Sequence, residues 1–334
     1  MQRNRILALQ IMAANLIAPH HAVAAPDLAQ YPSSTLSNSY LTVRFYLPDA
    51  EKGYYRGTRF DWSGLISRVD CGGHAFFCEF KPEEHDPSNH DDICGTAEEF
   101  GMTIHPPGFD RARAGEPFLK LGVGVLERPD ASDYNFSKRY RILKAGSWSI
   151  TQNSDSVEFG QALEGPNGWA YAYTKKIRLA ADSGALTISR RLKNTGSKTI
   201  DTDQYGHNFL RIDGAPSGPT YRLSFPFTPR FAPESQAQGS VECRANSLAF
   251  LQEIRDKPVW VRLQGFAGIA DNRIQVDHQR NGSSLRIETD QPLVRLVFYS
   301  SGGVLSPEPF VKFSIPPGET REWVTTYRFL YRPG

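Results

Sequence analysis

Two residues stand out because they can exchange protons near neutral pH and lie where apolar strand patterns end. His207 lies in the segment 201–210, and Glu308 lies between two prolines in the segment 304–311. A carboxylate and an imidazole from distant strands form a natural acid–base pair when the fold brings them together. Each residue also has a purely structural interpretation, His207 as a hydrogen-bonded core histidine and Glu308 as an acid fixed in a loop.

Alternating apolar and polar residues predict that strands position both segments. Residues 170–179 and 185–193 alternate strictly around a turn at 181–184, which predicts a hairpin with one buried and one solvated face. Strand patterns separated by turns recur from Tyr40 onward, and no later stretch predicts a long amphipathic helix. We therefore expect an all-β fold, a large antiparallel β-sandwich that forms one domain over residues 40–334.

Residues 81–117 differ from the rest of the chain because they are rich in histidine, acids and proline. Long polar loops inside compact domains are more often functional than incidental, so we expect this loop to contribute to a site. The apolar run 119–126 follows and predicts one buried strand.

The segments around both candidate residues carry a recognisable order of motifs. The hairpin ends in Asn-Thr-Gly at 194–196, and His207 with the aromatic Phe209 follows on the next predicted strand. Glu308 precedes a Pro-Gly-Glu-Thr turn at 317–320 and a last strand. This order resembles the aldose 1-epimerase (galactose mutarotase-like) superfamily over roughly residues 40–331. The resemblance implies a large β-sandwich that binds a sugar on the concave face of one sheet.

The resemblance also implies a reaction, the interconversion of the α and β anomers of a sugar. In this reaction a base removes the proton of the anomeric hydroxyl while an acid protonates the ring oxygen, so that the ring opens and can close on the other face. By similarity, Glu308 is the base and His207 is the acid. We expect no cofactor and no metal ion.

Further residues are expected to hold the sugar. We expect Arg59 and Asp277 to bind its hydroxyl groups. The aromatic side chains of Trp62 and Tyr205 are candidates to stack on its apolar face, with buried packing as the alternative for both.

The sequence departs from the family in two places. The family has a second histidine in a glycine-rich context, which the corresponding region lacks; among His85, His90 and His105, our candidate is His105 because two prolines follow it. The segment 55–64 resembles a divergent exported branch more than the housekeeping mutarotases, which leaves the identity of the sugar open.

The N-terminus predicts a secretory signal peptide over residues 1–25. Arg3 and Arg5 precede an apolar stretch at 6–18, and the small residues at 22–25 suit a signal peptidase. An N-terminal helix packed on the domain is the alternative. We expect export, to the periplasm in a Gram-negative bacterium, and a loose polar N-terminal arm over residues 26–39. No later run is long enough to predict a membrane span.

Composition limits the partners. The chain has 334 residues, 40% of them hydrophobic, and a formal net charge of +2 for which Arg3 and Arg5 of the leader account. Such a chain can bury a large core, which excludes global disorder. A neutral mature chain offers no general attraction to nucleic acid. The partner that we expect is a sugar or an oligosaccharide.

The chain has four cysteines: Cys71, Cys78, Cys94 and Cys243. After export they would meet an oxidising compartment, and a disulfide among the first three is one expectation, with the pairing left open. A zinc site that joins Cys78 and Cys94 to His85 and His90 is an alternative, although its spacing matches no standard zinc pattern.

Two other functions fit the same residues. A non-catalytic carbohydrate-binding module would bind saccharides without anomer exchange. A glycan-cleaving hydrolase or lyase would use the same acid–base pair to shorten chains. The sequence after the leader contains no Gly-x-Ser-x-Gly nucleophile elbow and no phosphate-binding glycine loop followed by a helix, which argues against a serine hydrolase and a nucleotide-dependent enzyme.

Overall fold

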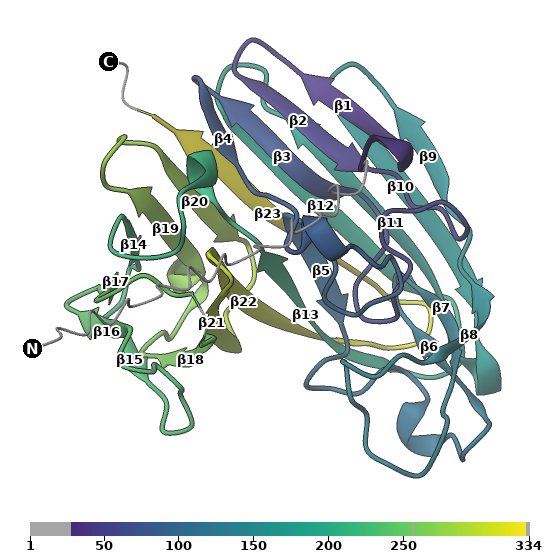
Figure 1. Ribbon diagram of the computed structural model, residues 1–334. Helices are drawn as coiled ribbons and strands as arrows, with labels where there is room; N and C mark the ends of the chain where they lie inside the picture. The colour runs from purple at the N-terminus through teal and green to yellow at the C-terminus, as the bar shows by residue number, and fades with distance from the viewer. Residues whose placement is uncertain (1–27, 256, 332–334) are drawn as a thin grey trace, which may run out of the picture.

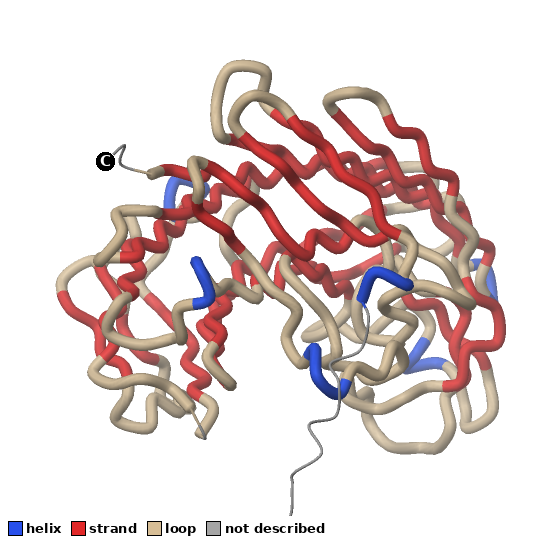
Figure 2. Tube along the Cα trace, turned by 45° about the horizontal axis from the view of Figure 1, so that its top comes forward, coloured by secondary structure: helices blue, strands red, loops and turns tan. Residues whose placement is uncertain are grey.

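The computed structural model describes residues 28–255 and 257–331, in which strands dominate (Figure 1). The helical segments of this part are short 3-10 turns, blue in Figure 2: Leu28–Gln30, Pro82–Glu84, Phe109–Arg111, Pro166–Gly168, Ile212–Gly214 and Ile269–Asp271. Within it, no helix has the length and apolar character that crossing a membrane requires. The expected signal peptide, residues 1–25, lies outside the described residues.

Two large antiparallel sheets confirm the expected all-β class. The first has ten strands, in the order β16 (Val241–Arg244), β17 (Ser247–Phe250), β14 (Tyr221–Ser224), β19 (Arg273–His278), β20 (Ser284–Thr289), β23 (Thr320–Leu330), β12 (Ala185–Asn194), β11 (Ala170–Leu179), β10 (Ser156–Glu164) and β9 (Ser149–Gln152). The second has six strands, in the order β15 (Arg230–Phe231), β18 (Val259–Gln264), β21 (Arg295–Ser301), β22 (Val304–Ile315), β13 (Ile200–Asn208) and β5 (Thr96–Phe100).

The predicted hairpin is β11 with β12, and its side chains alternate between buried and more accessible positions as the sequence predicts. Its buried face packs on the six-stranded sheet in an apolar cluster that includes Phe100, Leu192, Phe313 and Trp323. Because side chains alternate along a strand, the other face of the six-stranded sheet is free to carry different residues. That second face carries Tyr205, Phe209 and Phe310, which pack with loop aromatics in a separate cluster.

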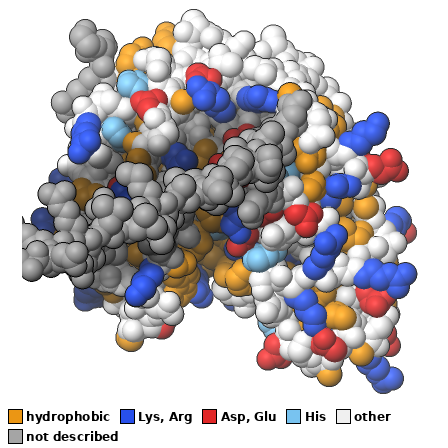
Figure 3. All heavy atoms as spheres, viewed as in Figure 1, with side chains coloured by type: hydrophobic (Ala, Val, Ile, Leu, Met, Phe, Trp, Pro, Cys, Tyr) orange, Lys and Arg blue, Asp and Glu red, His pale blue; other side chains and the backbone are white. Residues whose placement is uncertain are grey.

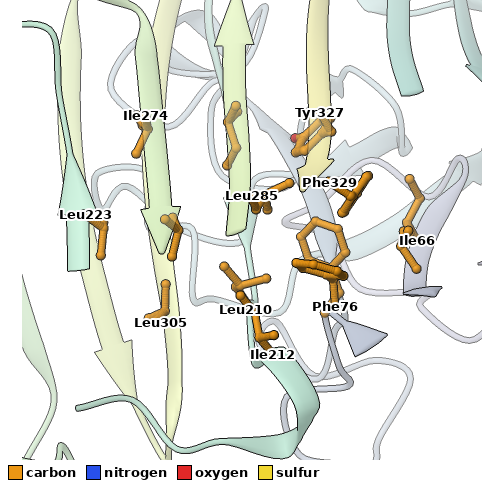
Figure 4. Packing of buried hydrophobic residues seen from close by; sticks show 14 of the residues in the cluster. Ile66, Phe76, Leu210, Ile212, Leu223, Ile274, Leu285, Leu305, Tyr327 and Phe329 are labelled. Carbon is orange, nitrogen blue, oxygen red and sulfur yellow. The ribbon is translucent and has the colours of Figure 1, made fainter. Parts of the chain in front are cut away.

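Two smaller sheets complete the fold: β1 (Ser33–Ser37), β2 (Leu41–Tyr46), β3 (Leu65–Cys71) and β4 (His74–Phe76) in one, and β6 (Pro117–Lys120), β7 (Gly124–Glu127) and β8 (Arg141–Ala145) in the other. The largest apolar cluster joins the four-stranded sheet to the ten-stranded sheet; part of it is shown in Figure 4, where Ile66 and Phe76 lie beside Phe329 and Tyr327.

Three local expectations need correction. The arm expected over 26–39 contains β1, which pairs with β2 along its length and buries Leu36. The loop expected over 81–117 contains β5, because Thr96–Phe100 pairs with β13. The single strand expected over 119–126 is two strands, because Gly122 turns the chain at φ +75° and a side chain there would collide with Asp61.

Candidate functional site

The structure brings His207 and Glu308 into contact. His207 is on β13 and Glu308 is on β22, and these strands pair in the six-stranded sheet, with β13 next to the edge strand β5 (Figure 1). His207 Nε2 lies 3.0 Å from Glu308 Oε1. On the other side of the ring, His207 Nδ1 lies 2.8 Å from Ser306 Oγ. We call His207 and Glu308 the dyad; Ser306 is on the same face of β22 because it precedes Glu308 by two residues.

Aromatic rings fix the orientation of the imidazole. Phe209 stacks on the His207 ring with 4.0 Å between ring centres, and Tyr299 and Phe60 meet it edge-on at 5.5 and 5.9 Å. The side chains of His207 and Glu308 are 5% and 6% exposed. The dyad is therefore held in an apolar frame and reaches the surface through a small area.

Burial determines the protonation of the dyad. It raises the pKa of Glu308 to about 8, and the nearby Glu99 charge adds to this effect, whereas the charge of Arg59, a hydrogen bond with Ser306 and the charge of Arg295 oppose it. Burial, together with the positive charge of Arg59, lowers the pKa of His207 well below its usual 6.5. At neutral pH the dyad is thus a protonated carboxyl beside a neutral imidazole.

This charge state assigns the hydrogen bonds. The Glu308 hydroxyl donates to His207 Nε2, so the ring proton is on Nδ1, which donates to Ser306 Oγ. The alternative, an ionised carboxylate beside an imidazolium, holds the same number of protons but places two charges in an apolar frame. The dyad therefore carries one exchangeable proton between its two members.

Arg59 lies beside the dyad in a network of carboxylates. Its Nε donates to Glu99 Oε2 at 2.8 Å, one terminal nitrogen donates to Asp91 Oδ1 at 2.5 Å, and the other donates to the Tyr205 hydroxyl at 2.8 Å. Despite burial, the hydrogen bond from His90 and the charge of Arg59 hold the pKa of Asp91 below its usual range. The expected sugar-binding residue Arg59 is thus at the site, with much of its hydrogen-bonding capacity already engaged.

Glu99 links this network to a buried lysine. Lys120 Nζ lies 3.4 Å from Glu99 Oε1 and donates to the Tyr134 hydroxyl at 2.8 Å and to the Phe100 carbonyl. Burial lowers the pKa of Lys120. A buried carboxylate and two buried cations are expensive unless they are paired, so this network fixes Arg59 and Tyr205 in one arrangement.

A second ionic network holds the opposite face of β5. Glu98 lies next to Glu99 and points between the sheets, where it binds Arg190 at 2.5 Å and Lys175 at 3.4 Å. Lys175 also lies 3.5 Å from Asp61. Each of these four side chains is at most 2% exposed. The hairpin β11–β12 thereby anchors β5, which in turn positions Glu99 under the site.

Not every expected site residue joins the dyad. Tyr205 is completely buried and stacks on Phe310, so it supports the site from below instead of presenting its ring to a ligand. Trp62 is also buried, with its indole N–H bonded to the Gly57 carbonyl. Asp277 is on β19 of the ten-stranded sheet, beside Gln275. Sequence spacing could not reveal these orientations because they depend on which strands pair.

The three candidate histidines have separate environments. His105 pairs with Asp110 at 2.7 Å in the loop that follows β5. His85 stacks on Tyr54 at 4.1 Å. His90 lies 3.2 Å from Asp91 and is therefore the histidine connected to the Arg59 network. The structure does not bring our candidate His105 to the dyad.

The cysteines form no disulfide, and all four are free thiols. Among the described residues, no group of three or more His, Cys, Asp or Glu side chains is placed to hold a metal ion, so the alternative zinc site is not assembled. The face of the molecule in Figure 3 mixes basic, acidic and apolar side chains without a field of one sign.

Sequence reasoning missed Asp91, Glu99, Ser306 and Arg295. The signal for Glu99 was two consecutive acids in a segment, 96–100, that is otherwise suited to a strand. The signal for Ser306 was its spacing of two from Glu308, which places both side chains on one face of a strand.

Comparisons with known proteins rest on structure. No protein-family model and no curated protein matches the sequence. The Slr1438 protein of Synechocystis sp. PCC 6803 aligns with a TM-score of 0.56 at 13% identity, over 90% of this chain and 96% of its own. A galactose mutarotase-like protein from Lactobacillus casei ATCC 334 aligns with a TM-score of 0.53 at 12% identity, over 89% and 100%. The chain has the galactose mutarotase-like fold.

A further structure extends this likeness. A galactose mutarotase related enzyme from Lactobacillus acidophilus aligns with a TM-score of 0.54 at 11% identity, over 89% of this chain and 97% of its own. These alignments confirm the fold that the resemblance implied. The galactose mutarotase-like fold hosts the dyad on the outer face of its six-stranded sheet, and the function has to be argued from that site.

Proposed function

We propose that this protein is an exported, carbohydrate-active enzyme that interconverts sugar anomers with the dyad His207 and Glu308. The observation that carries the proposal is the 3.0 Å contact between an imidazole and a carboxyl group on neighbouring strands. The galactose mutarotase-like fold supports a sugar as the substrate, because the solved structures that share it include mutarotase-related proteins.

The reaction needs a proton taken from one oxygen and a proton given to another. In a cyclic sugar the anomeric hydroxyl and the ring oxygen are bonded to the same carbon, so an acid and a base in mutual contact can reach both. His207 takes the proton of the anomeric hydroxyl while Glu308 gives its proton to the ring oxygen. The bond from the anomeric carbon to the ring oxygen then breaks, and an open-chain aldehyde forms.

The dyad is restored when the ring closes. The ring-opened state leaves an imidazolium beside a carboxylate, an ion pair that the contact stabilises. Rotation about the bond next to the aldehyde presents its other face, and ring closure returns the proton to Glu308 and releases the one held by His207. In this scheme Glu308 is the acid and His207 is the base, the reverse of the roles implied by the resemblance, because burial favours the uncharged form of both.

Arg59 supports the reaction from one side of the dyad. Three of its donors are engaged by Glu99, Asp91 and Tyr205, which fix the guanidinium plane. The remaining N–H groups are available to a sugar hydroxyl. The signal peptide that the sequence predicts over residues 1–25 supports a site of action outside the cytoplasm.

The experiment is an exchange NMR panel on free sugars with the purified protein. We expect α/β exchange faster than the protein-free rate on at least one sugar, and near the protein-free rate with Glu308→Gln. Oligosaccharides in the same panel report cleavage. Chain shortening would establish a hydrolase or lyase instead, and saccharide binding unchanged by Glu308→Gln without anomer exchange would establish a binding module.

A further inference from the structure

Arginine and aromatic side chains continue the site face of the six-stranded sheet beyond the dyad. Arg295 on β21 pairs with Phe310 on β22, two residues from Glu308. In antiparallel sheets such diagonal neighbours lie about 7–8 Å apart on the same face. Tyr299 is on the same face of β21, and Trp260 on β18 pairs with it. The register therefore places Arg295 and Tyr299 beside the dyad, and Trp260 beyond Tyr299 on the next strand, β18.

Arg295 differs from the other cations near the site because it has no acidic partner. Among the described residues, no salt bridge or hydrogen bond engages its guanidinium, and its Nε is buried without a partner. Its charge centre lies 5.7 Å from the rings of both Trp260 and Phe310, which hold the side chain over an aromatic surface. The nearby Glu234 is already paired with Arg262.

Arg59 and Arg295 differ in whether nearby carboxylates balance their charge. Arg59 and Lys120 are matched by the carboxylates of Glu99 and Asp91, so that side of the site is electrically balanced. The side formed by β21 keeps one unmatched positive charge. The two terminal nitrogens of Arg295 have no hydrogen-bond partner among the described residues and are not buried, so their N–H groups can donate to an anionic ligand.

We propose that Arg295, with Trp260 and Tyr299, forms a subsite for an anionic substituent, so that the substrate is a sugar carrying a carboxylate, sulfate or phosphate group. The planar guanidinium presents parallel N–H donors that match such groups in a two-pronged hydrogen bond. The half-buried rings of Tyr299 and Trp260 offer apolar faces to the sugar ring. The diagonal separation of Arg295 from Glu308 suits a charge on an exocyclic carbon while the anomeric centre meets the dyad.

This inference rests on the proposed function for its reaction but is tested by binding alone. The probes are methyl glycosides, which lack a free anomeric hydroxyl and bind without reacting: methyl α-glucuronide against methyl α-glucoside, with the 6-sulfate and 6-phosphate of the glucoside as further arms. Calorimetric titration compares the wild type, Arg295→Gln and the control Arg321→Gln, whose arginine is exposed on β23. Inorganic sulfate alone reports whether the sugar is needed.

We expect at least one anionic glycoside to bind the wild type about tenfold or more tightly than the neutral one, because a charge-assisted hydrogen bond is worth at least that factor. Arg295→Gln should remove the preference, added salt should weaken it, and Arg321→Gln should keep it. Equal affinity for charged and neutral glycosides, or a preference that survives in Arg295→Gln, would overturn the subsite.

The comparison of charged with neutral glycosides on the wild-type protein needs no variant. The charge preference can therefore be tested even if Arg295→Gln folds poorly. The two proposals also fail separately. A charge preference that depends on Arg295, without anomer exchange on the free acids, would refute the proposed reaction and support the proposed subsite. Anomer exchange without any preference for charged glycosides would support the proposed reaction and refute the proposed subsite.

Discussion

Replacing Glu308 with glutamine tests the charge state of the dyad through protein stability. The pKa of Glu308 rises from 4.5 to about 8 on folding, so the folded chain holds the proton more tightly than the unfolded chain. A group of this kind contributes stability that is complete below about pH 4.5 and is lost as the pH rises through about 8. Glutamine mimics the protonated carboxyl in shape and hydrogen bonding, and it does not titrate.

The magnitude follows from the size of the shift. Each unit of pKa corresponds to about 1.4 kcal/mol, so between about pH 5 and about pH 8.5 the wild type should lose about 4 kcal/mol of unfolding free energy that Glu308→Gln keeps. The variant should therefore match the wild type near pH 5 and be the more stable of the two at alkaline pH.

The assay is urea unfolding at a series of pH values, with the unfolding free energy extrapolated to water. Glu322→Gln, at an exposed carboxylate on β23, is measured in parallel to correct for effects of pH on the whole protein. A difference between Glu308→Gln and the wild type that does not change with pH would refute the neutral dyad. A variant that becomes less stable than the wild type as the pH rises would show an ionised Glu308 paired with an imidazolium.

Three further predictions concern activity and the buried networks. The rate of anomer exchange, measured as kcat/KM against pH, should fall on the alkaline side with an apparent pKa of about 8. It should show no acid limb near 6.5, because burial lowers the pKa of His207 while it raises that of Glu308. An acid limb near 6.5 with no alkaline decline would contradict this prediction. Glu99→Gln should lower kcat/KM by about 100-fold, because Arg59 and Tyr205 lose the carboxylate that fixes their arrangement. An unchanged rate would show that Arg59 keeps its position without the Glu99 carboxylate. Glu98→Gln should lower the unfolding free energy, measured by urea unfolding, by about 3–5 kcal/mol, because Arg190 and Lys175 lose their shared carboxylate. A loss below about 1 kcal/mol would show that this network does not anchor β5.

The sequence predicts those features that depend on local patterns. Strict alternation over 170–179 and 185–193 predicted the hairpin, because one face must be buried and the other solvated. Residue types together with the family resemblance selected His207 and Glu308, because an imidazole and a carboxyl group exchange protons when the fold brings them together. Glu308 was expected where a strand pattern ends, whereas the structure places it inside β22.

Features that depend on long-range pairing could not be predicted. Which side chains of β13 and β22 lie next to each other on one face of the sheet depends on the register between strands about a hundred residues apart, and that register stacks Tyr205 on Phe310 in a buried position. The acids in the segment 96–100 argue against a buried strand when only the sequence is considered. In the structure Arg190 and Lys175 of the hairpin neutralise Glu98, and this pairing cannot be read from the local sequence. Asp277 and His105 have suitable side chains but lie on elements that the fold keeps away from the dyad.

The fold also explains why the site tolerates two buried ionic networks. Glu98 and Glu99 are consecutive on β5 and therefore point to opposite faces, one toward the hairpin and one toward Arg59. The cations of the two networks come from different parts of the chain: Arg59 and Lys120 pair with Glu99, and Lys175 and Arg190 pair with Glu98. An edge strand that would otherwise be weakly held is thus fixed on both sides, which keeps the Arg59 network aligned with the dyad.

The central claim is that His207 and Glu308 act as one unit that moves a single proton. The most direct measurement is kcat/KM for anomer exchange in Glu308→Gln, His207→Asn and the double variant. Each single substitution should lower the rate by roughly 10²–10⁴-fold, and the double variant should be no slower than the slower single variant. Losses that multiply in the double variant, or a rate unchanged by either single substitution, would contradict the account.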